Sequence, residues 1–404
     1  MAGEYPLLIS ADDHVVEPPD VWTSRLPTRY REIGPRVVRQ RIPRIEKGSM
    51  DMQVTESDDG EWADVWHYEG LRSPLMLQSA AAGFPRNEVG VRAVTFDEIR
   101  PGCWQPKERL KDMDIAGVEA QVCFPNVAPV RFCGQVFLKA EDKDLALLCV
   151  KAYNDWTIDE WCAGSGGRLV PCGIIPLWDA QLAADEVRRM AARGMRGMCF
   201  SEAPFYLGLP TIHTSYWDPF FAACEETDTV VMIHIGSSSR VNVPSGEDTP
   251  QGEYTVITTL NATASVVDWL FSGVVVRFPK LKVLFAECQI GWLPYYLQRM
   301  DEMWEQDRAY MKEQYAAVPN LPSSYFRSNL YVTFFSDQLG LRLLDDLGAE
   351  NVLCETDYPH NDTTWPTSQD YLRKQTEAVG LDDVTTEKIV RGNARRLFRM
   401  DQLV

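Results

Sequence analysis

Short apolar runs alternate along the chain with stretches in which apolar residues recur every three or four positions. Short apolar runs predict buried strands, and apolar residues that recur every three or four positions predict amphipathic helices. We therefore expect strands at residues 7–11, 120–124, 169–176, 197–201, 230–234, 283–287, 330–334 and 352–356. We expect helices at residues 106–116, 145–163, 180–193, 218–226, 259–271 and 339–347.

The order of these elements predicts the fold class. Eight strands, most of them followed by a helix, favour an α/β (β/α)₈ TIM barrel. Gly117, Gly194 and Gly348 follow three of the predicted helices, where glycine commonly ends a helix. We therefore expect residues 1–404 to form one barrel domain.

Residues 35–105 interrupt this alternation between the first strand and the first helix. They are rich in Trp, Pro, Gly and acidic residues, and residues 64–70 suggest a small hairpin. We interpret this segment as an insertion after strand 1 that roofs the barrel mouth, together with a second long loop at 236–255. The alternative is a surface feature away from the functional site.

The composition narrows the class of partner. A net charge of −18 repels nucleic acid and anionic membrane surfaces. The chain has no run of 18 apolar residues and no basic-then-apolar start, so we expect a cytoplasmic protein. Its ten cysteines lack a Cys-x-x-Cys pair, which favours buried thiols over a zinc–thiolate site.

Titratable residues gather where the predicted strands end. Asp12 and His14 are two positions apart after the first apolar run, so they face the same side of an extended chain. Barrel enzymes place their chemistry at the carboxyl ends of the strands. Carboxylates that share a site repel one another, and a divalent cation removes that conflict. The predicted metal ligands are Asp12, His14, Glu202, His234, Glu287 and Asp357.

This pattern resembles the amidohydrolase superfamily, in particular its branch of metal-dependent decarboxylases and hydrolases. The resemblance rests on the strand-1 motif, the strand-5 histidine His234 and the strand-8 aspartate Asp357. The segments FPKLKVLFAE, IGWLPY and KIVRGNARRLF are also similar to that branch. The resemblance runs from residue 7 to 399 without the insertion, and it implies the fold more strongly than the reaction.

The chain departs from the family pattern at three positions. Asp12-x-His14 stands for the usual His-x-His, Glu202 for a bridging lysine and Glu287 for a histidine. The carboxylate-rich set that results favours iron or manganese over zinc, with Glu202 bridging two ions. It also resembles a member of this branch that is a non-haem di-iron monooxygenase of diterpenoid antibiotic biosynthesis.

We therefore expect a di-iron monooxygenase that hydroxylates a bulky, mostly apolar small molecule, such as a terpenoid or its coenzyme A thioester. This interpretation implies two iron ions, an external reductant, an electron-transfer partner and a homodimer. One alternative is a manganese- or zinc-dependent hydrolase or non-oxidative decarboxylase. A second alternative is a binding protein with an inactive site.

Two further residues are candidates for catalysis. Glu17 lies three positions after His14 and could be a further ligand, a partner of an imidazole N–H, or only a turn carboxylate. His360 lies three positions after Asp357 and could be an acid/base group, a ligand, or neither.

Overall fold

The computed structural model describes residues 5–45, 53–241, 243–313 and 315–402. Its parallel strands occupy eight positions around a barrel, of which the third is split by Pro171, a residue without a backbone N–H. The strand order is β1-β5-β6 followed by β7-β8-β9-β10-β11-β12. These strands are β1 (Leu8–Val15), β5 (Val118–Pro125), β6 (Leu169–Val170), β7 (Cys172–Gly173), β8 (Gly197–Ser201), β9 (Val230–His234), β10 (Val283–Ala286), β11 (Leu330–Phe334) and β12 (Val352–Cys354).

The barrel closes where β1 meets the chain that follows β12. The backbone N–H of Asp357 donates to the carbonyl oxygen of Asp12 at 3.1 Å. The backbone N–H of His14 donates to the carbonyl oxygen of Tyr358 at 2.6 Å. The predicted (β/α)₈ class is therefore confirmed, and its seam lies at residues proposed as metal ligands.

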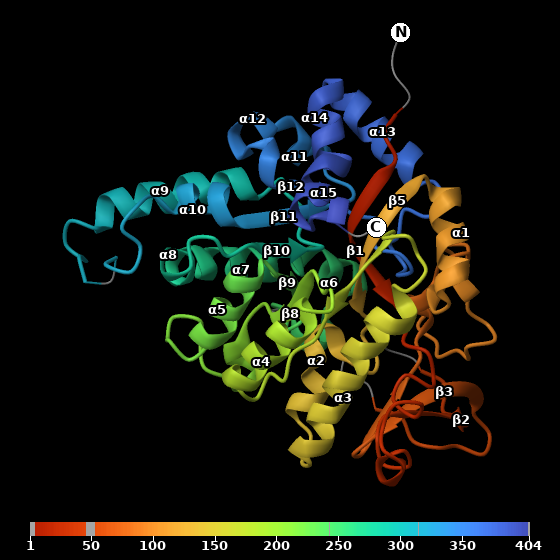
Figure 1. Cartoon of the computed structure of the whole chain (residues 1–404). Coiled ribbons are helices and arrows are strands. Elements are labelled where there is room, and N and C mark those ends of the chain that lie inside the picture. Colours follow the sequence, from red (N-terminus) through yellow and green to blue (C-terminus); the bar gives the residue numbers. More distant parts are fainter. Residues whose placement is uncertain (1–4, 46–52, 242, 314, 403–404) are drawn as a thin grey trace.

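Helices surround the strands, as Figure 1 shows. Two predicted helices have the observed bounds, α1 (Pro106–Ala116) and α7 (Thr259–Phe271). Four other predictions correspond to α3 (Lys143–Trp156) with a π-helical turn (Thr157–Trp161), α4 (Ala180–Ala191), α5 (Asp218–Thr227), and the pair α11 (Gln338–Arg342) and α12 (Leu344–Leu347). The predictions missed α2 (Arg131–Leu138), α6 (Gln251–Ile257), α8 (Val274–Arg277), α9 (Leu293–Asp307), α10 (Pro322–Asn329), α13 (Ser368–Val379), α14 (Asp383–Glu387) and α15 (Asn393–Leu397).

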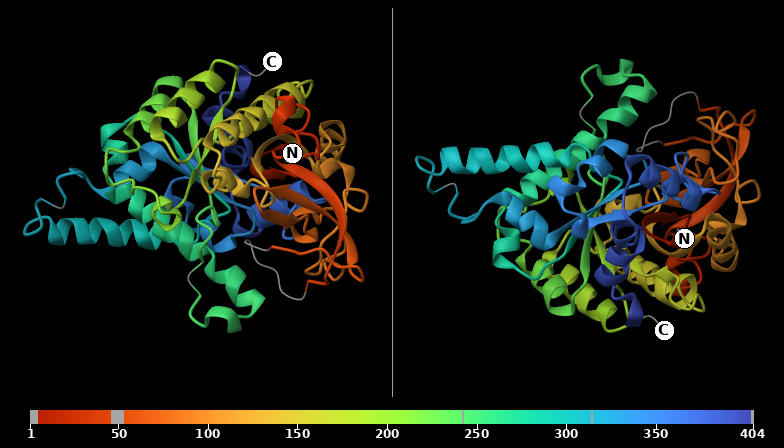
Figure 2. Two further views of the ribbon diagram at one scale, coloured as in Figure 1. Left: turned by 90° about the horizontal axis from the view of Figure 1, so that it is seen from below. Right: turned by 90° about the horizontal axis from the view of Figure 1, so that it is seen from above.

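The insertion between β1 and α1 contains a three-stranded antiparallel sheet of β2 (Arg36–Ile42), β3 (Glu61–Tyr68) and β4 (Leu71–Pro74). Glu69 and Gly70 join β3 to β4 with φ angles of 41° and 87°, as a tight hairpin turn requires. The predicted hairpin is confirmed and is longer than expected. In Figures 1 and 2 the sheet lies on one side of the barrel, opposite the arm formed by α9 and α10.

Part of the insertion reaches the carboxyl ends of the strands. The backbone N–H groups of Ala81 and Ala82 donate to the carbonyl oxygen of Pro359 at 2.7 and 3.1 Å. The carbonyl oxygen of Ser79 accepts from the Asn126 side chain at 3.0 Å. These bonds attach residues 79–82 to the loops after β5 and β12. That the whole insertion roofs the mouth stays a prediction.

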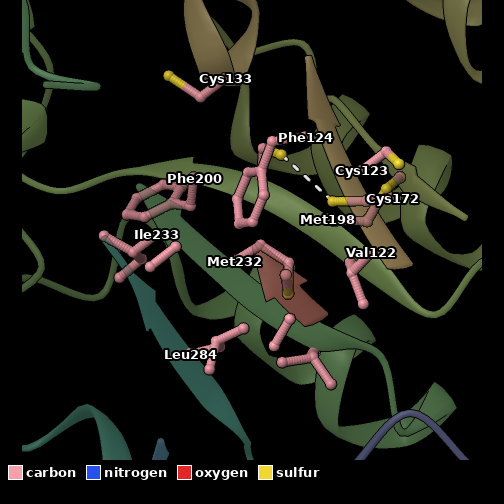
Figure 3. Close-up of a cluster of buried hydrophobic side chains, with 14 of the residues drawn as sticks. Val122, Cys123, Phe124, Cys133, Cys172, Met198, Phe200, Met232, Ile233 and Leu284 are labelled. Carbon is pink, nitrogen blue, oxygen red and sulfur yellow. Dashed lines mark hydrogen bonds between the residues drawn. The ribbon is translucent and has the colours of Figure 1, made fainter. Parts of the chain in front are cut away.

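Buried apolar side chains pack between the strands (Figure 3). One of them, Phe124, lies 6.0 Å from the His14 ring and 5.3 Å from the His234 ring, between centroids, so the core borders the candidate site directly. All ten cysteines are free, and nine of them are buried, as expected. Within the described parts of the chain, no helix has the length and apolarity that a membrane span requires. The labelled core residues are Val122, Cys123, Phe124, Cys133, Cys172, Met198, Phe200, Met232, Ile233 and Leu284.

Candidate metal centre

An irregularity in β1 precedes the first two candidate ligands. Ser10 pairs with Gln121 and Asp13 pairs with Cys123, so β1 holds one more residue than β5 over this stretch. A bulge of this kind redirects side chains and is common beside active sites. Asp12 and His14 are both fully buried, and their side chains come together with His234 from the end of β9.

The imidazole rings of His14 and His234 face each other in an arrangement that a bound cation would satisfy. Their Nε2 atoms are 3.1 Å apart. His14 Nδ1 lies 3.2 Å from the carbonyl oxygen of Pro125, and His234 Nδ1 lies 2.6 Å from that of Ile235. A carbonyl can only accept, so each neutral ring carries its proton on Nδ1. Both Nε2 lone pairs then point at each other, an arrangement typical of metal-binding histidines.

Two aspartates supply oxygen atoms at the same point. Asp12 Oδ1 lies 3.6 Å from His14 Nε2, Asp12 Oδ2 lies 3.5 Å from His234 Nε2, and Asp357 Oδ1 lies 3.3 Å from His14 Nε2. Ligands about 2.1 Å from a tetrahedral metal are themselves about 3.4 Å apart. None of these carboxylate oxygens has a hydrogen-bond donor among the described residues. The four residues therefore fit a single divalent ion.

The electrostatics of the metal-free site support this interpretation. Burial, followed by neighbouring carboxylates such as Glu355, raises the pKa of Asp12 well above its usual value. Burial and then Asp362 and Glu287 do the same for the pKa of Asp357. Burial lowers the pKa of His234 to about 3. Each group thus favours its neutral form in the absence of metal, and a bound cation would favour charged carboxylates and neutral imidazoles.

His360 is a third imidazole at this centre. Glu17 does not contact His360 directly, and Asn126 lies between the two side chains. His360 stacks on His14 with ring centroids 3.8 Å apart, and its Nδ1 lies 3.0 Å from Asp357 Oδ1. Its Nε2 contacts Asn126 Oδ1 at 3.2 Å. Glu17 is fully buried, and its Oε1 accepts from the Asn126 backbone at 3.1 Å. The structure thus places His360 in the centre and connects Glu17 to it only through Asn126.

Glu287 lies on the more exposed side of the centre. Its Oε2 is 3.4 Å from His234 Nε2, and its side chain is 22% exposed, whereas Asp12, His14 and Asp357 are fully buried. Glu287 groups with Asp357 and Asp362, all close enough to share an ion. Glu287 and Asp357 have φ angles of 57° and 49°, a backbone conformation that is uncommon for non-glycine residues and is enriched at functional sites.

Glu202, the expected bridging ligand, is held away from this centre. Its Oε1 accepts hydrogen bonds from the backbone of Gly236 and Ser238, from the Ser238 hydroxyl at 2.6 Å and from the Asn261 side chain. It belongs to none of the candidate metal groups within the described ranges. The loop after β9 and Asn261 therefore occupy Oε1 of the carboxylate that the sequence pattern assigned to a metal bridge, while Oε2 has no hydrogen-bond partner among the described residues.

The sequence pattern missed three polar residues that adjoin the ligands. Asp362 follows Asp357 by five positions, and Glu355 precedes it by two, so clustering of acids around strand 8 was an available signal. Asn126 directly follows Pro125 at the end of β5 and gives no such signal. An apolar wall was also missed, since the Phe132 ring stacks on His234 at 4.2 Å.

The chain resembles proteins of known family. The family model described as amidohydrolase matches residues 61–400. Among curated proteins, gamma-resorcylate decarboxylase of Rhizobium sp. is 24% identical over 72% of this chain and 86% of the relative. The 2-amino-3-carboxymuconate-6-semialdehyde decarboxylase of Dictyostelium discoideum is 25% identical over 85% of this chain and 86% of the relative.

Solved structures share the fold. An amidohydrolase from Mycobacterium avium subsp. paratuberculosis superposes with a TM-score of 0.72 and 19% identity, over 98% of this chain and all of the other. The 5-carboxyvanillate decarboxylase from Sphingomonas paucimobilis gives a TM-score of 0.61 and 19% identity, over 97% and 98% of the two chains. A dihydroxybenzoic acid decarboxylase from Polaromonas sp., solved with bound manganese, gives 0.59 and 21%, over 76% and 90%.

These comparisons correct the predicted function. The di-iron monooxygenase interpretation is wrong, because the curated relatives are decarboxylases and not oxidoreductases. The alternative of a metal-dependent decarboxylase agrees with them better. The physical error was to infer oxygen chemistry from the number of carboxylates: Glu202 Oε1 accepts hydrogen bonds from the loop after β9, and Glu287, 3.4 Å from His234 Nε2, does not by itself favour oxidation over decarboxylation.

Proposed function

The chain belongs to the amidohydrolase family, and from that premise we propose that it is a metal-dependent, non-oxidative decarboxylase. Its metal would be one divalent ion, manganese or zinc, held by Asp12, His14, His234 and Asp357. Its substrate would be a carboxylic acid on an aromatic ring or a conjugated chain.

One observation carries the metal assignment. The Nε2 atoms of His14 and His234 are 3.1 Å apart while both Nδ1 atoms contact backbone carbonyls. Two lone pairs at this distance repel unless a cation lies between them. The oxygens of Asp12 and Asp357 surround the same point without hydrogen-bond donors in the described structure, which gives two nitrogen and two oxygen ligands.

The relatives support the reaction and the substrate class. Gamma-resorcylate and 2-amino-3-carboxymuconate-6-semialdehyde are both named as substrates of decarboxylases that match most of this chain. A fold neighbour with manganese is a decarboxylase of a dihydroxybenzoic acid. In each case the named acid carries its carboxylate on an unsaturated carbon; when that carbon takes up a proton, the electron pair of the breaking bond can return to the π system as CO₂ leaves.

The proposed reaction balances without a redox partner. The bond between the carboxylate carbon and the substrate carbon breaks, and CO₂ leaves. The substrate carbon takes up one proton, and the electron pair of the broken bond stays with the substrate, where it restores the unsaturated system. No electron is gained or lost, so the reductant, the electron-transfer partner and the second iron expected from the sequence have no role here.

The residues of the candidate site fall into two groups, a fully buried group and a partly exposed group. Asp12, His14 and Asp357 form the fully buried floor, which excludes water from the ligands. Glu287 and His360, whose side chains are 22% and 10% exposed, lie toward the open side and would contact the substrate. When bound, the metal would supply positive charge that orients the substrate and stabilises negative charge developing on it. We assign the proton delivered to the substrate carbon to His360.

The direct test is CO₂ release by protein reconstituted with manganese or zinc. We expect 2,6-dihydroxybenzoate, 5-carboxyvanillate or a related unsaturated acid to lose CO₂ equally fast with and without oxygen. His360→Gln should retain the metal and lose about 100-fold or more in kcat, as expected for a proton-transfer group. Oxygen-dependent turnover, or amide hydrolysis without CO₂, would contradict the proposal.

A further inference from the structure

The Glu287 side chain points opposite to the direction that its strand predicts. Successive side chains of a strand point to opposite faces. In β10, Ala286 pairs with His234 of β9 and therefore faces the candidate metal centre. Phe285 faces the helices, since its ring lies 6.4 Å from that of Trp269 in α7, between centroids. Residue 287 would face the helices too if the strand continued, yet Glu287 Oε2 lies 3.4 Å from His234 Nε2.

A left-handed backbone conformation accompanies this reversal. Glu287 has a φ angle of 57°, and Gln289 has one of 54°. L-residues with a side chain disfavour this region, so the surrounding structure must hold the segment in place. At its far end, the backbone N–H groups of Ile290 and Gly291 donate to Asp337 Oδ2 at 2.8 and 2.6 Å. Its near end, at Glu287, needs a second attachment.

That second attachment comes from side chains of the next two strand positions. The backbone N–H of Glu287 donates to Thr333 Oγ1 at 2.9 Å and to Glu355 Oε2 at 3.0 Å. Thr333 lies on β11 and is fully buried, and its hydroxyl donates to Glu355 Oε2. A backbone N–H can only donate, so the Thr333 oxygen is the acceptor in its contact with Glu287. A side-chain hydroxyl thus binds the residue at which the chain turns.

We infer that Thr333 is a positioning residue: its hydroxyl holds the backbone of Glu287 in the left-handed conformation and so turns the Glu287 carboxylate toward the candidate metal centre. Thr333 acts through Glu287 and not on the substrate. That Glu287 contacts a substrate rests on the proposed decarboxylase function. The hydrogen bond and the direction of the side chain do not, since both belong to the chain alone.

Amide hydrogen exchange of metal-free protein tests the hydrogen bond directly. Mass spectrometry with fragmentation to single residues gives the exchange rate of the Glu287 amide. Thr333→Val replaces the hydroxyl with a methyl group of similar size, so this amide should exchange at least about 10-fold faster than in wild-type protein. Thr333→Ser keeps the hydroxyl and should keep the wild-type rate. Equal rates in wild-type protein and Thr333→Val, or fast exchange in Thr333→Ser, overturn the inference.

Thr157→Val is the matched control for loss of a buried threonine hydroxyl. Thr157 is 2% exposed, and its hydroxyl donates to the carbonyl oxygen of Tyr153 at 3.0 Å. It belongs to the π-helical turn after α3 and has no contact with Glu287. Its variant should therefore leave the exchange rate of the Glu287 amide unchanged. Acceleration of that amide in Thr157→Val equal to that in Thr333→Val would make the effect one of general destabilisation and overturn the inference.

CO₂ release then reports on the direction of the Glu287 carboxylate. With manganese bound at the wild-type level, Thr333→Val should lose about 10- to 100-fold in kcat, because a site group is misplaced. Thr333→Ser should restore kcat, and Thr157→Val should not lower it. If wild-type protein releases no CO₂ from any acid, the proposed function fails, while the exchange rates still decide the role of Thr333.

A double-mutant cycle shows whether Thr333 acts through Glu287. Glu287→Ala removes the carboxylate, so adding Thr333→Val to this variant should change kcat by no more than about 2-fold. A loss of the same size in both backgrounds would mean that Thr333 acts on the reaction by another route. That result overturns the positioning inference and leaves the decarboxylase proposal standing.

Discussion

Two buried polar regions share the loop after β12, and they differ in how their carboxylates are satisfied. In the first, Asp112 accepts from Arg100 at 2.7 and 2.8 Å and from the Tyr358 hydroxyl at 2.6 Å. In the second, the candidate metal centre, both oxygens of Asp12 and both of Asp357 lack a donor among the described residues. Tyr358 and Asp357 are adjacent in the chain, so the two regions are separated by very little structure.

The difference teaches how to recognise a site from its hydrogen bonds. A buried carboxylate with all its partners holds segments together, as Asp112 holds α1 to the loop after β12. A buried carboxylate with both oxygens lacking donors costs free energy in the folded protein and marks a place where a bound ligand can compensate. Arg109 belongs to the first kind of region, since it donates to the carbonyl oxygens of Gly102 and His14 and lies 4.2 Å from the Tyr358 ring centre.

The largest expected effect comes from breaking the metal centre. His14→Gln should lower CO₂ release by at least about 1000-fold, which corresponds to about 4 kcal/mol, because a metal ligand is lost. Its metal content, measured by elemental analysis, should fall well below one ion per chain. His213→Gln is the control, because His213 is paired with Asp268 on the surface. Full activity in His14→Gln would show that the histidine pair does not hold the metal.

A second prediction compares the two aspartates in metal-free protein. Asp112→Ala should lower the free energy of unfolding by about 3 kcal/mol, because Tyr358 and Arg100 lose their acceptor. Asp12→Asn should leave it about unchanged, because burial already favours the neutral form of Asp12 in metal-free protein and asparagine is neutral and of similar shape. Urea unfolding of both variants measures the difference. Equal losses would mean that Asp12 is structural, like Asp112.

Adding metal should raise the free energy of unfolding only when the candidate metal centre is intact. Manganese at a free concentration 100 times its Kd should raise the free energy of unfolding of wild-type protein by about 2.7 kcal/mol. The same concentration should give Asp12→Asn a much smaller gain and Asp112→Ala the full gain, measured by urea unfolding with and without chelator. A gain that Asp12→Asn keeps in full would remove Asp12 from the ligand set.

The smallest effect concerns pH and Glu17, which is buried beside the centre. Burial raises the pKa of Glu17 from 4.5 to about 8. Its contribution to stability is therefore full below pH 4.5 and is lost as pH rises through 8. Between pH 6 and 8, metal-free wild-type protein should lose about 2 kcal/mol more than Glu17→Gln, since each pH unit is worth up to about 1.4 kcal/mol. Parallel pH slopes of the two proteins would place the Glu17 carboxyl in contact with solvent.

The sequence predicted the parts of this molecule that depend on local pattern. The strands β8, β9 and β11 have the expected bounds, because each is a continuous apolar run. Asp12, His14, His234 and Asp357 converge because parallel barrel strands bring their carboxyl ends together. The helix α9 was missed although its buried residues Leu293, Leu297, Met300 and Trp304 recur at helical spacing, because exposed aromatic residues such as Tyr295 lie among them.

The rest depended on contacts between distant segments. Glu202 looked like a ligand at the end of β8, and only the fold of residues 236–238 shows that backbone donors hold its Oε1. Asn126 looked like an ordinary loop residue until its distance to His360 was known. The reaction was mispredicted for a related reason. A carboxylate at position 287 does not distinguish oxygenation from decarboxylation unless its place in the site is known.

The closure of the barrel at Asp12 and His14 has a consequence for the order in which the protein matures during synthesis. Asp12 and His14 leave the ribosome early. Their backbone partners, Asp357 and Tyr358, are translated more than 340 residues later. Translation proceeds at about 5–20 residues per second, so β1 waits tens of seconds for its second neighbour. Binding of the proposed metal ion by all four residues would therefore be a late event, and a nascent chain stalled before β12 would lack Asp357 of the proposed ligand set.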